Sequence, residues 1–140
     1  MRRVLPLMLV ALVAAAGTAL AAPGARVGVH QTSLGKVLAD AKGRTLYVFD
    51  GASCTGACAA AWPPLLTAGK PTGVAKLGTK KLANGKLQVT FAGKPLYRYA
   101  VDRSPGDVNG ASVAHWFALS PAGAKLHAAA SGGYGGDYGP

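Results

Sequence analysis

Two cysteines are the residues whose type and spacing point most directly to chemistry. Cys54 and Cys58 form a C-x-x-x-C pair and are the only cysteines among the 140 residues. An even cysteine count predicts a disulfide wherever a chain is exported to an oxidising compartment, here one that closes a very small loop. On an ideal helix the Cβ atoms of residues i and i+4 are about 5–6 Å apart, whereas a disulfide needs about 3.8 Å. We therefore expect a distorted turn over residues 55–57, which Gly56 makes easier.

The alternative chemistry for this pair is a soft-metal site. Two reduced thiolates and a histidine form a ligand set that selects Cu(I). The candidate third ligands are His30, His115 and His127, and we favour His115 because it lies within the second repeat described below. No histidine is close to the cysteines in sequence, so the disulfide is the preferred interpretation. Ala59 follows Cys58, which excludes the C-x-x-C-H motif of c-type haem.

The remaining side chains offer little catalytic chemistry. All five acidic residues are aspartates, so no Glu-based acid/base pair exists. The sequence lacks a G-x-S-x-G elbow, a phosphate loop and a dinucleotide fingerprint. Two cysteines and scattered histidines are also too few for a structural zinc site with four ligands. We predict a non-enzymatic protein without a cofactor, copper being the cofactor only under the alternative.

The N-terminus predicts export. A basic start at residues 1–3 is followed by an apolar run over residues 4–16 and an A-x-A pattern at residues 19–21. This order is typical of a secretory signal peptide, here residues 1–21. The apolar run is shorter than the ~20 residues that span a membrane, and no cysteine is placed to accept a lipid anchor. We expect a periplasmic, cell-surface or extracellular protein with no transmembrane segment in the mature chain.

An internal repeat organises the rest of the chain. The segment GRTLYVFD at residues 43–50 matches GKPLYRY at residues 93–99, and Tyr47 and Tyr97 are 50 residues apart. Each copy is followed by a tryptophan. The matched aromatic positions are Tyr47 with Tyr97, Phe49 with Tyr99, and Trp62 with Trp116. A period near 50 in only two copies favours two half-sheets that share one core over a solenoid.

Each copy has the pattern of a β-hairpin. Residues 37–49 and 87–99 contain short alternating strands with glycine at the turn. Because side chains alternate along a strand, Leu46 and Val48 should face one side, and Tyr47 and Phe49 the other. Further expectations are a turn at residues 84–85, a strand at residues 116–119 and a helical turn within residues 55–61.

These elements predict an all-β protein with two hairpin-containing repeats of about 50 residues sharing one core. The 20 glycines and nine prolines of the chain support a turn-rich fold. We place the tandem-repeat domain at residues 22–127, with copies near 34–66 and 86–121. The glycine-rich residues 128–140 are predicted to be a disordered tail.

The motifs also resemble a known family. Residues 96–102, LYRYAVD, fit the Tyr-x-(Phe/Trp/Tyr)-x-x-Asp signature of bacterial secreted-repeat proteins, often called predicted lipoproteins of that motif. The cysteine loop before Trp62-Pro63-Pro64-Leu65, and the Pro105-Gly106-Asp107 segment before Trp116, are similar to the same family. The resemblance covers roughly residues 34–121 and implies a fold rather than an activity. It implies these site residues: Tyr47, Phe49, Asp50, Trp62, Tyr97, Tyr99, Asp102, Asp107 and Trp116.

The first copy departs from the family pattern. Its aspartate position holds Ala52, and Asp50 comes two residues early. The loop that follows Asp50 is short. A lipid-acceptor cysteine, which many relatives carry, is missing as well.

Charge gives the last indication of function. The mature chain would keep 13 basic and five acidic residues, a formal net charge of +8. Lys80 and Lys81 are its only adjacent basic pair. Such a chain is attracted to anionic envelope polymers or lipid surfaces, whereas export disfavours nucleic acid. The sequence thus predicts an exported, non-enzymatic β module with a binding or envelope-associated role. The alternative is an exported redox or copper-handling protein that uses Cys54 and Cys58.

Overall fold

The structure, a computed structural model, describes Ala11, Gly17 and residues 22–128. The predicted signal peptide and glycine-rich tail lie almost entirely outside the described residues. The described elements, in chain order, are β1 (Arg26–Thr32), β2 (Gly35–Ala39), β3 (Tyr47–Phe49), α1 (Ala57–Ala61), β4 (Leu66–Thr67), β5 (Thr72–Gly73), β6 (Leu77–Lys81), β7 (Leu87–Phe91), β8 (Lys94–Pro95), the 3-10 helix η1 (Asn109–Ser112), β9 (Trp116–Leu119) and β10 (Lys125–Leu126).

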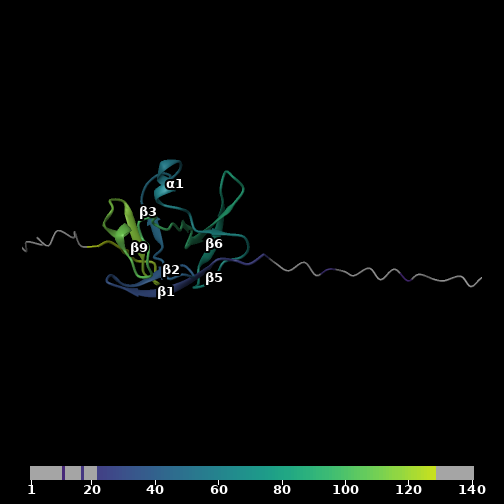
Figure 1. Ribbon diagram of the computed structural model, residues 1–140, viewed down its shortest axis with the longest axis horizontal. Helices are drawn as coiled ribbons and strands as arrows, with labels where there is room; N and C mark the ends of the chain where they lie inside the picture. The colour runs from purple at the N-terminus through teal and green to yellow at the C-terminus, as the bar shows by residue number, and fades with distance from the viewer. Residues whose placement is uncertain (1–10, 12–16, 18–21, 129–140) are drawn as a thin grey trace, which may run out of the picture.

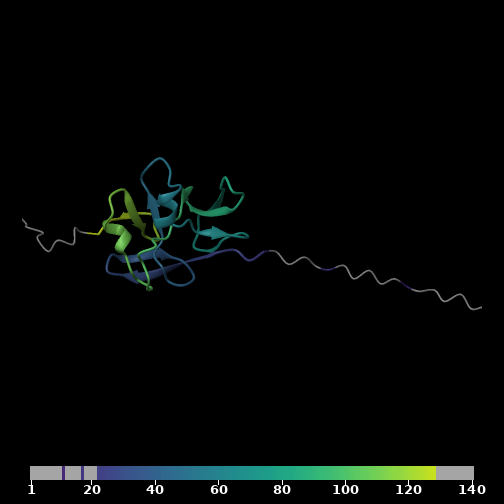
Figure 2. The same ribbon diagram turned by 45° about the horizontal axis from the view of Figure 1, so that its top comes forward.

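The strands form three small sheets, in the orders β2-β1-β5, β10-β9-β3 and β4-β7-β6, with β8 added to β7. All pairings are antiparallel except β1 with β5. Figures 1 and 2 show β1 and β2 along one side of the body, with α1 and the β6–β7 hairpin rising from the opposite side. The all-β prediction is therefore confirmed, and short helical turns are the only helices in the described residues.

Local sequence explains several elements directly. Gly85 adopts φ +82° in the turn between β6 and β7, a conformation that glycine tolerates without a Cβ penalty. The Asn84 side-chain oxygen accepts a hydrogen bond from the Lys86 amide at 3.0 Å and closes this turn. Strand β9 has the predicted bounds, and α1 lies within the predicted helical turn.

Alternation along β3 divides the interior into two clusters. Leu46 and Val48 lie in an aliphatic cluster, whereas Tyr47 and Phe49 lie in an aromatic cluster, as the pattern predicts. The buried aliphatic cluster comprises Val27, Leu38, Leu46, Val48, Leu65, Val89, Phe91, Leu96 and Leu119. The buried aromatic cluster comprises Val37, Tyr47, Cys54, Trp62, Tyr97, Ala111, Trp116 and Ala118. Because each cluster draws on both copies, neither copy has a complete core of its own.

The two copies meet at their central tyrosines. The Tyr47 amide donates to the Tyr97 carbonyl at 2.8 Å, and the Tyr97 amide donates to the Tyr47 carbonyl at 2.9 Å. On its other side, Tyr47 pairs with Ala118 and Tyr97 pairs with Pro64. Ala118 and Pro64 each follow the tryptophan of the opposite copy by two residues. Each tyrosine segment is thus completed by the other copy, which gives the molecule an approximate two-fold symmetry.

Candidate functional site

The symmetry brings four aromatic rings into one continuous stack in the order Tyr99, Trp62, Trp116, Phe49. The centroid distances along it are 3.9, 3.7 and 4.6 Å, and the interplanar angles are 20°, 3° and 26°. Both tryptophans are buried. At the centre the two indoles lie nearly parallel, one from each copy. Parallel rings at this separation bury large apolar faces and add a pairwise attraction.

The two central tyrosines meet this stack edge-on. Tyr47 contacts Trp62 at 5.5 Å and 82°, and Tyr97 contacts Trp116 at 5.2 Å and 88°. Each tyrosine thus touches the tryptophan of its own copy. The matching geometry indicates that the aromatic positions paired in the sequence occupy corresponding places in the fold.

A buried carboxylate holds Tyr47 in place. The Tyr47 hydroxyl donates to Asp102 Oδ2 at 2.5 Å, and Asp102 is only 1% exposed. The other carboxylate oxygen accepts hydrogen bonds from the Asn109 amide at 3.0 Å and from Asn109 Nδ2 at 2.9 Å. The Gly110 amide donates to the Tyr47 hydroxyl oxygen at 3.2 Å. These bonds tie the second-copy loop to the tyrosine of the first copy.

Burial shifts the pKa values of both partners. Desolvation raises the pKa of Asp102, while hydrogen bonds from Tyr47 and Asn109 oppose that rise. Desolvation also raises the pKa of Tyr47 far above its ordinary value of 10.0, and the bond to Asp102 adds to the rise. The phenol therefore remains a protonated donor throughout the range in which exported proteins work.

This shift predicts a loss of stability in alkali. Because the folded-state pKa of Tyr47 lies above the unfolded value, the stabilisation is present below pH 10 and is lost as pH rises further. The loss is about 1.4 kcal/mol per pH unit. Hence the stability advantage of the wild type over Tyr47→Phe should shrink above this point in urea unfolding measured at increasing pH. An advantage that stays constant into strong alkali would contradict the assignment.

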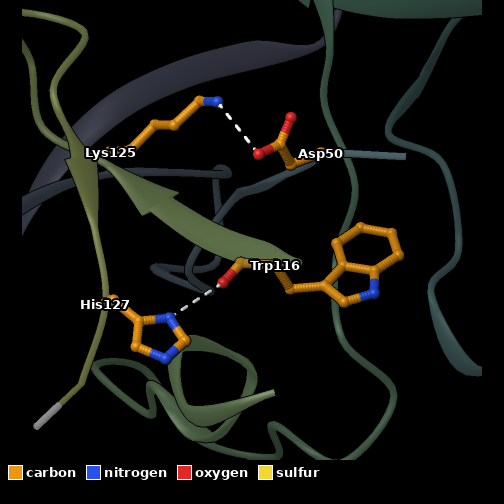
Figure 3. Close-up of polar contacts among 4 residues, drawn as sticks. All are labelled: Asp50, Trp116, Lys125 and His127. Atoms are coloured by element: carbon orange, nitrogen blue, oxygen red, sulfur yellow. Dashed lines mark hydrogen bonds and ion pairs between the residues drawn. The ribbon is translucent and has the colours of Figure 1, made fainter. Parts of the chain in front are cut away.

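The other two motif aspartates are not part of this network. Asp50 lies at the surface, where its carboxylate is 3.7 Å from Lys125 Nζ (Figure 3). Asp107 accepts hydrogen bonds from the amides of Arg103 and Ser104, both at 3.0 Å, and these lower its pKa. Of the nine predicted motif residues, seven thus meet around the stack and Asp50 and Asp107 do not. Sequence reasoning missed Asn109, although it lies in a loop rich in turn-forming residues.

The cysteine pair is bridged. Cys54 and Cys58 form a disulfide with an S–S distance of 2.10 Å. Gly56 between them has φ +58°, and α1 begins at the next residue. In this state neither sulfur is a thiolate. His115 is exposed, and the described residues contain no group of three or more His, Cys, Asp or Glu that could hold a metal ion.

A pocket of about 770 Å³ opens beside Tyr97, between the cysteine loop and the β6–β7 hairpin. We call it the Tyr97 pocket. Its charged lining residues are Asp50, Lys80, Lys94 and Lys125, and the rest of its wall comes mainly from Val48, Phe49, residues 51–56, residues 82–84 and Tyr97. The volume lies within the range of about 300–1,000 Å³ that is usual for small-molecule sites.

Two copies that pair through their central tyrosines and share their buried clusters define a β-rich tandem-repeat protein. Comparison with family models gives a match to a family described as a secreted repeat of unknown function, over residues 28–66 and 78–120. The chain belongs to this family. No curated protein and no solved structure matches it. None of the helices in the described part of the chain is long and apolar enough to cross a membrane.

Proposed function

We propose that this protein is an exported, non-catalytic binding module that attaches to anionic polymers of the cell envelope. Residues 1–21 would be removed on export. The carrying observation is a lysine-rich region built on the β6–β7 hairpin. We call it the lysine face; it comprises Lys76, Lys80, Lys81, Lys86 and Lys94, all of them exposed.

The acidic residues do little to neutralise these lysines. No acidic residue occurs between Asp50 and Asp102. Asp102 is buried and accepts a hydrogen bond from the Tyr47 hydroxyl, whereas Asp40 and Asp107 accept hydrogen bonds from nearby backbone amides. Among the described residues the one ion pair joins Asp50 to Lys125. The lysine face therefore presents uncompensated positive charge, which attracts and concentrates polyanions.

The apolar surface favours a polymer over a lipid bilayer. The large hydrophobic side chains exposed in the described residues are Val29 on β1, Leu66 on β4 and Val101 in the loop before η1. Membrane-surface proteins usually combine positive charge with a contiguous apolar face that enters the headgroup region. These three separate side chains do not supply one.

The test is binding of inorganic polyphosphate, used as a defined polyanion, to the purified mature protein. A double variant, Lys80→Gln with Lys81→Gln, should weaken binding about thirtyfold at low salt, since each lysine contributes about 1 kcal/mol near an anionic surface. Lys36→Gln with Lys42→Gln is the matched control, because it removes the same charge from exposed sites outside the lysine face.

Salt provides the second arm of this test. Wild-type affinity should fall steeply between about 0.01 and 1 M salt, as the Debye length shrinks from about 30 to 3 Å. Equal weakening by the two double variants would show that net charge alone drives binding and would contradict the assigned face. Absence of binding at low salt would refute the proposed function.

A further inference from the structure

The two tyrosines at the symmetry axis have different surroundings. The hydroxyl of Tyr47 is held by Asp102 and by the Gly110 amide. In the first copy Ala52 stands at the position of Asp102, and the Tyr97 hydroxyl makes no hydrogen bond to any residue that the structure describes. Tyr97 is 9% exposed, and it lines the pocket together with Ala52. The loop of the second copy thus satisfies the Tyr47 phenol of the first copy, whereas the loop of the first copy leaves the Tyr97 phenol of the second copy at a pocket.

Loop length and loop packing account for this difference. Sixteen residues connect Tyr99 to Trp116, but only twelve connect Phe49 to Trp62. The longer loop packs so closely that a Cβ on Gly110 would come within 2.8 Å of Tyr47 and Trp62. Gly56 is the corresponding glycine, six residues before Trp62, and nothing lies within 4 Å of a Cβ placed there. The short cysteine loop therefore enters the aromatic cluster through Cys54 but leaves its glycine position unpacked, and the Tyr97 pocket lies beside it.

The charges around the pocket suit an anion. Three lysines line it against a single carboxylate, that of Asp50. Asp50 and Lys125 form an ion pair, which leaves Lys80 and Lys94 without an acidic partner among the described residues. Apolar and small residues of the cysteine loop and of β3 form much of the remaining wall. A ligand that fits must combine a compact negative group with an apolar body.

We propose that the Tyr97 pocket binds a small molecule with one carboxylate on an apolar body, and that this carboxylate takes the place against Tyr97 that Asp102 occupies against Tyr47. The Tyr97 hydroxyl donates to the ligand carboxylate, and Lys94 and Lys80 supply the positive charge. Hydrogen bonds to charged groups are the stronger ones in proteins. This site shares Lys80 and Lys94 with the lysine face, but it differs from polymer attachment because it also needs the Tyr97 hydroxyl.

The experiment uses phenylacetate as the probe and amide NMR of the mature protein as the readout. Phenylacetate should shift the resonances of the cysteine loop and of residues 93–97, whereas neutral phenylacetamide should bind at least about tenfold more weakly, as expected when a charged hydrogen bond is lost. Tyr97→Phe should weaken the binding of phenylacetate by about tenfold or more. Tyr99→Phe removes a hydroxyl outside the pocket lining and serves as its control.

A second pair of variants keeps the proposal testable if Tyr97→Phe unfolds. Ala52→Asp restores the missing carboxylate, so it should displace phenylacetate by competing for the same hydroxyl and lysines. Ala60→Asp adds the same charge at an exposed site on α1 outside the pocket lining and should leave binding unchanged. Equal affinity for phenylacetate and phenylacetamide, or shifts confined to other regions, would overturn the proposal. Tyr97→Phe leaves every lysine in place and should not change polyphosphate binding, so the two proposals fail separately.

Discussion

Replacing Trp62 with alanine is expected to lower the free energy of unfolding by about 3–5 kcal/mol, the usual cost of removing a buried aromatic side chain. Trp62 contacts Tyr99 and Trp116 face to face and Tyr47 edge-on. Its removal leaves a cavity between the two copies at the centre of the aromatic cluster. Urea unfolding followed by circular dichroism measures the change. A loss below about 1 kcal/mol, the size typical of surface substitutions, would contradict the central role of the stack.

The symmetry adds a further expectation for this experiment. Trp116→Ala should cost a similar amount, because Trp116 occupies the corresponding place in the second copy. The double variant should cost less than the sum of the two, since the indoles are in direct contact at 3.7 Å. Val101→Ala, at a side chain that is 54% exposed, is the control and should have little effect.

Replacing Asp102 with alanine is expected to destabilise the protein by about 3 kcal/mol, because buried donors left without an acceptor each cost about 1–3 kcal/mol. The buried Tyr47 hydroxyl and two partly buried donors on Asn109 would lose their acceptor together. Asp102→Asn keeps the shape and one acceptor oxygen, so it should recover part of the loss. Chemical denaturation of the two variants measures the difference.

Asp107→Ala is the matched control for Asp102. Asp107 also accepts two backbone hydrogen bonds, but water can replace its exposed carboxylate. Its removal should therefore be much less costly. Equal losses of stability for Asp102→Ala and Asp107→Ala would show that the burial of Asp102 against Tyr47 does not increase its contribution to stability.

Alternation and turn chemistry made much of the fold predictable from the sequence. The sides taken by Leu46, Val48 and Tyr47 follow from the two-residue period of a strand, and the turn at Gly85 follows from its tolerance of positive φ. Strand β1 was not predicted, although Arg26–Thr32 pairs with both β2 and β5. The segment alone gives a mixed signal, since Val27 and Val29 favour a strand whereas Gly28 between them weakens it, and its pairing depends on distant partners.

The candidate site was predictable only in part. The repeat identified the aromatic pairs, but it could not show that each tyrosine strand is completed by the opposite copy. The bond between Tyr47 and Asp102 joins residues 55 positions apart, and no local pattern encodes it. The mature chain has one adjacent basic pair, whereas antiparallel pairing of β7 with β6 and with β8 brings Lys80, Lys81 and Lys94 onto strands that neighbour β7. Such long-range arrangements depend on tertiary packing, which periodicity does not report.

Mapping of polyphosphate contacts by amide NMR on the mature protein at low salt tests the central claim most directly. The account predicts that shifts concentrate on residues 76–94, including the adjacent lysines Lys80 and Lys81, and that they disappear in high salt. Residues around Lys36 and Lys42, which carry similar charge on another element, should shift little. Shifts spread evenly over all lysines, or no shifts at low salt, would contradict the account.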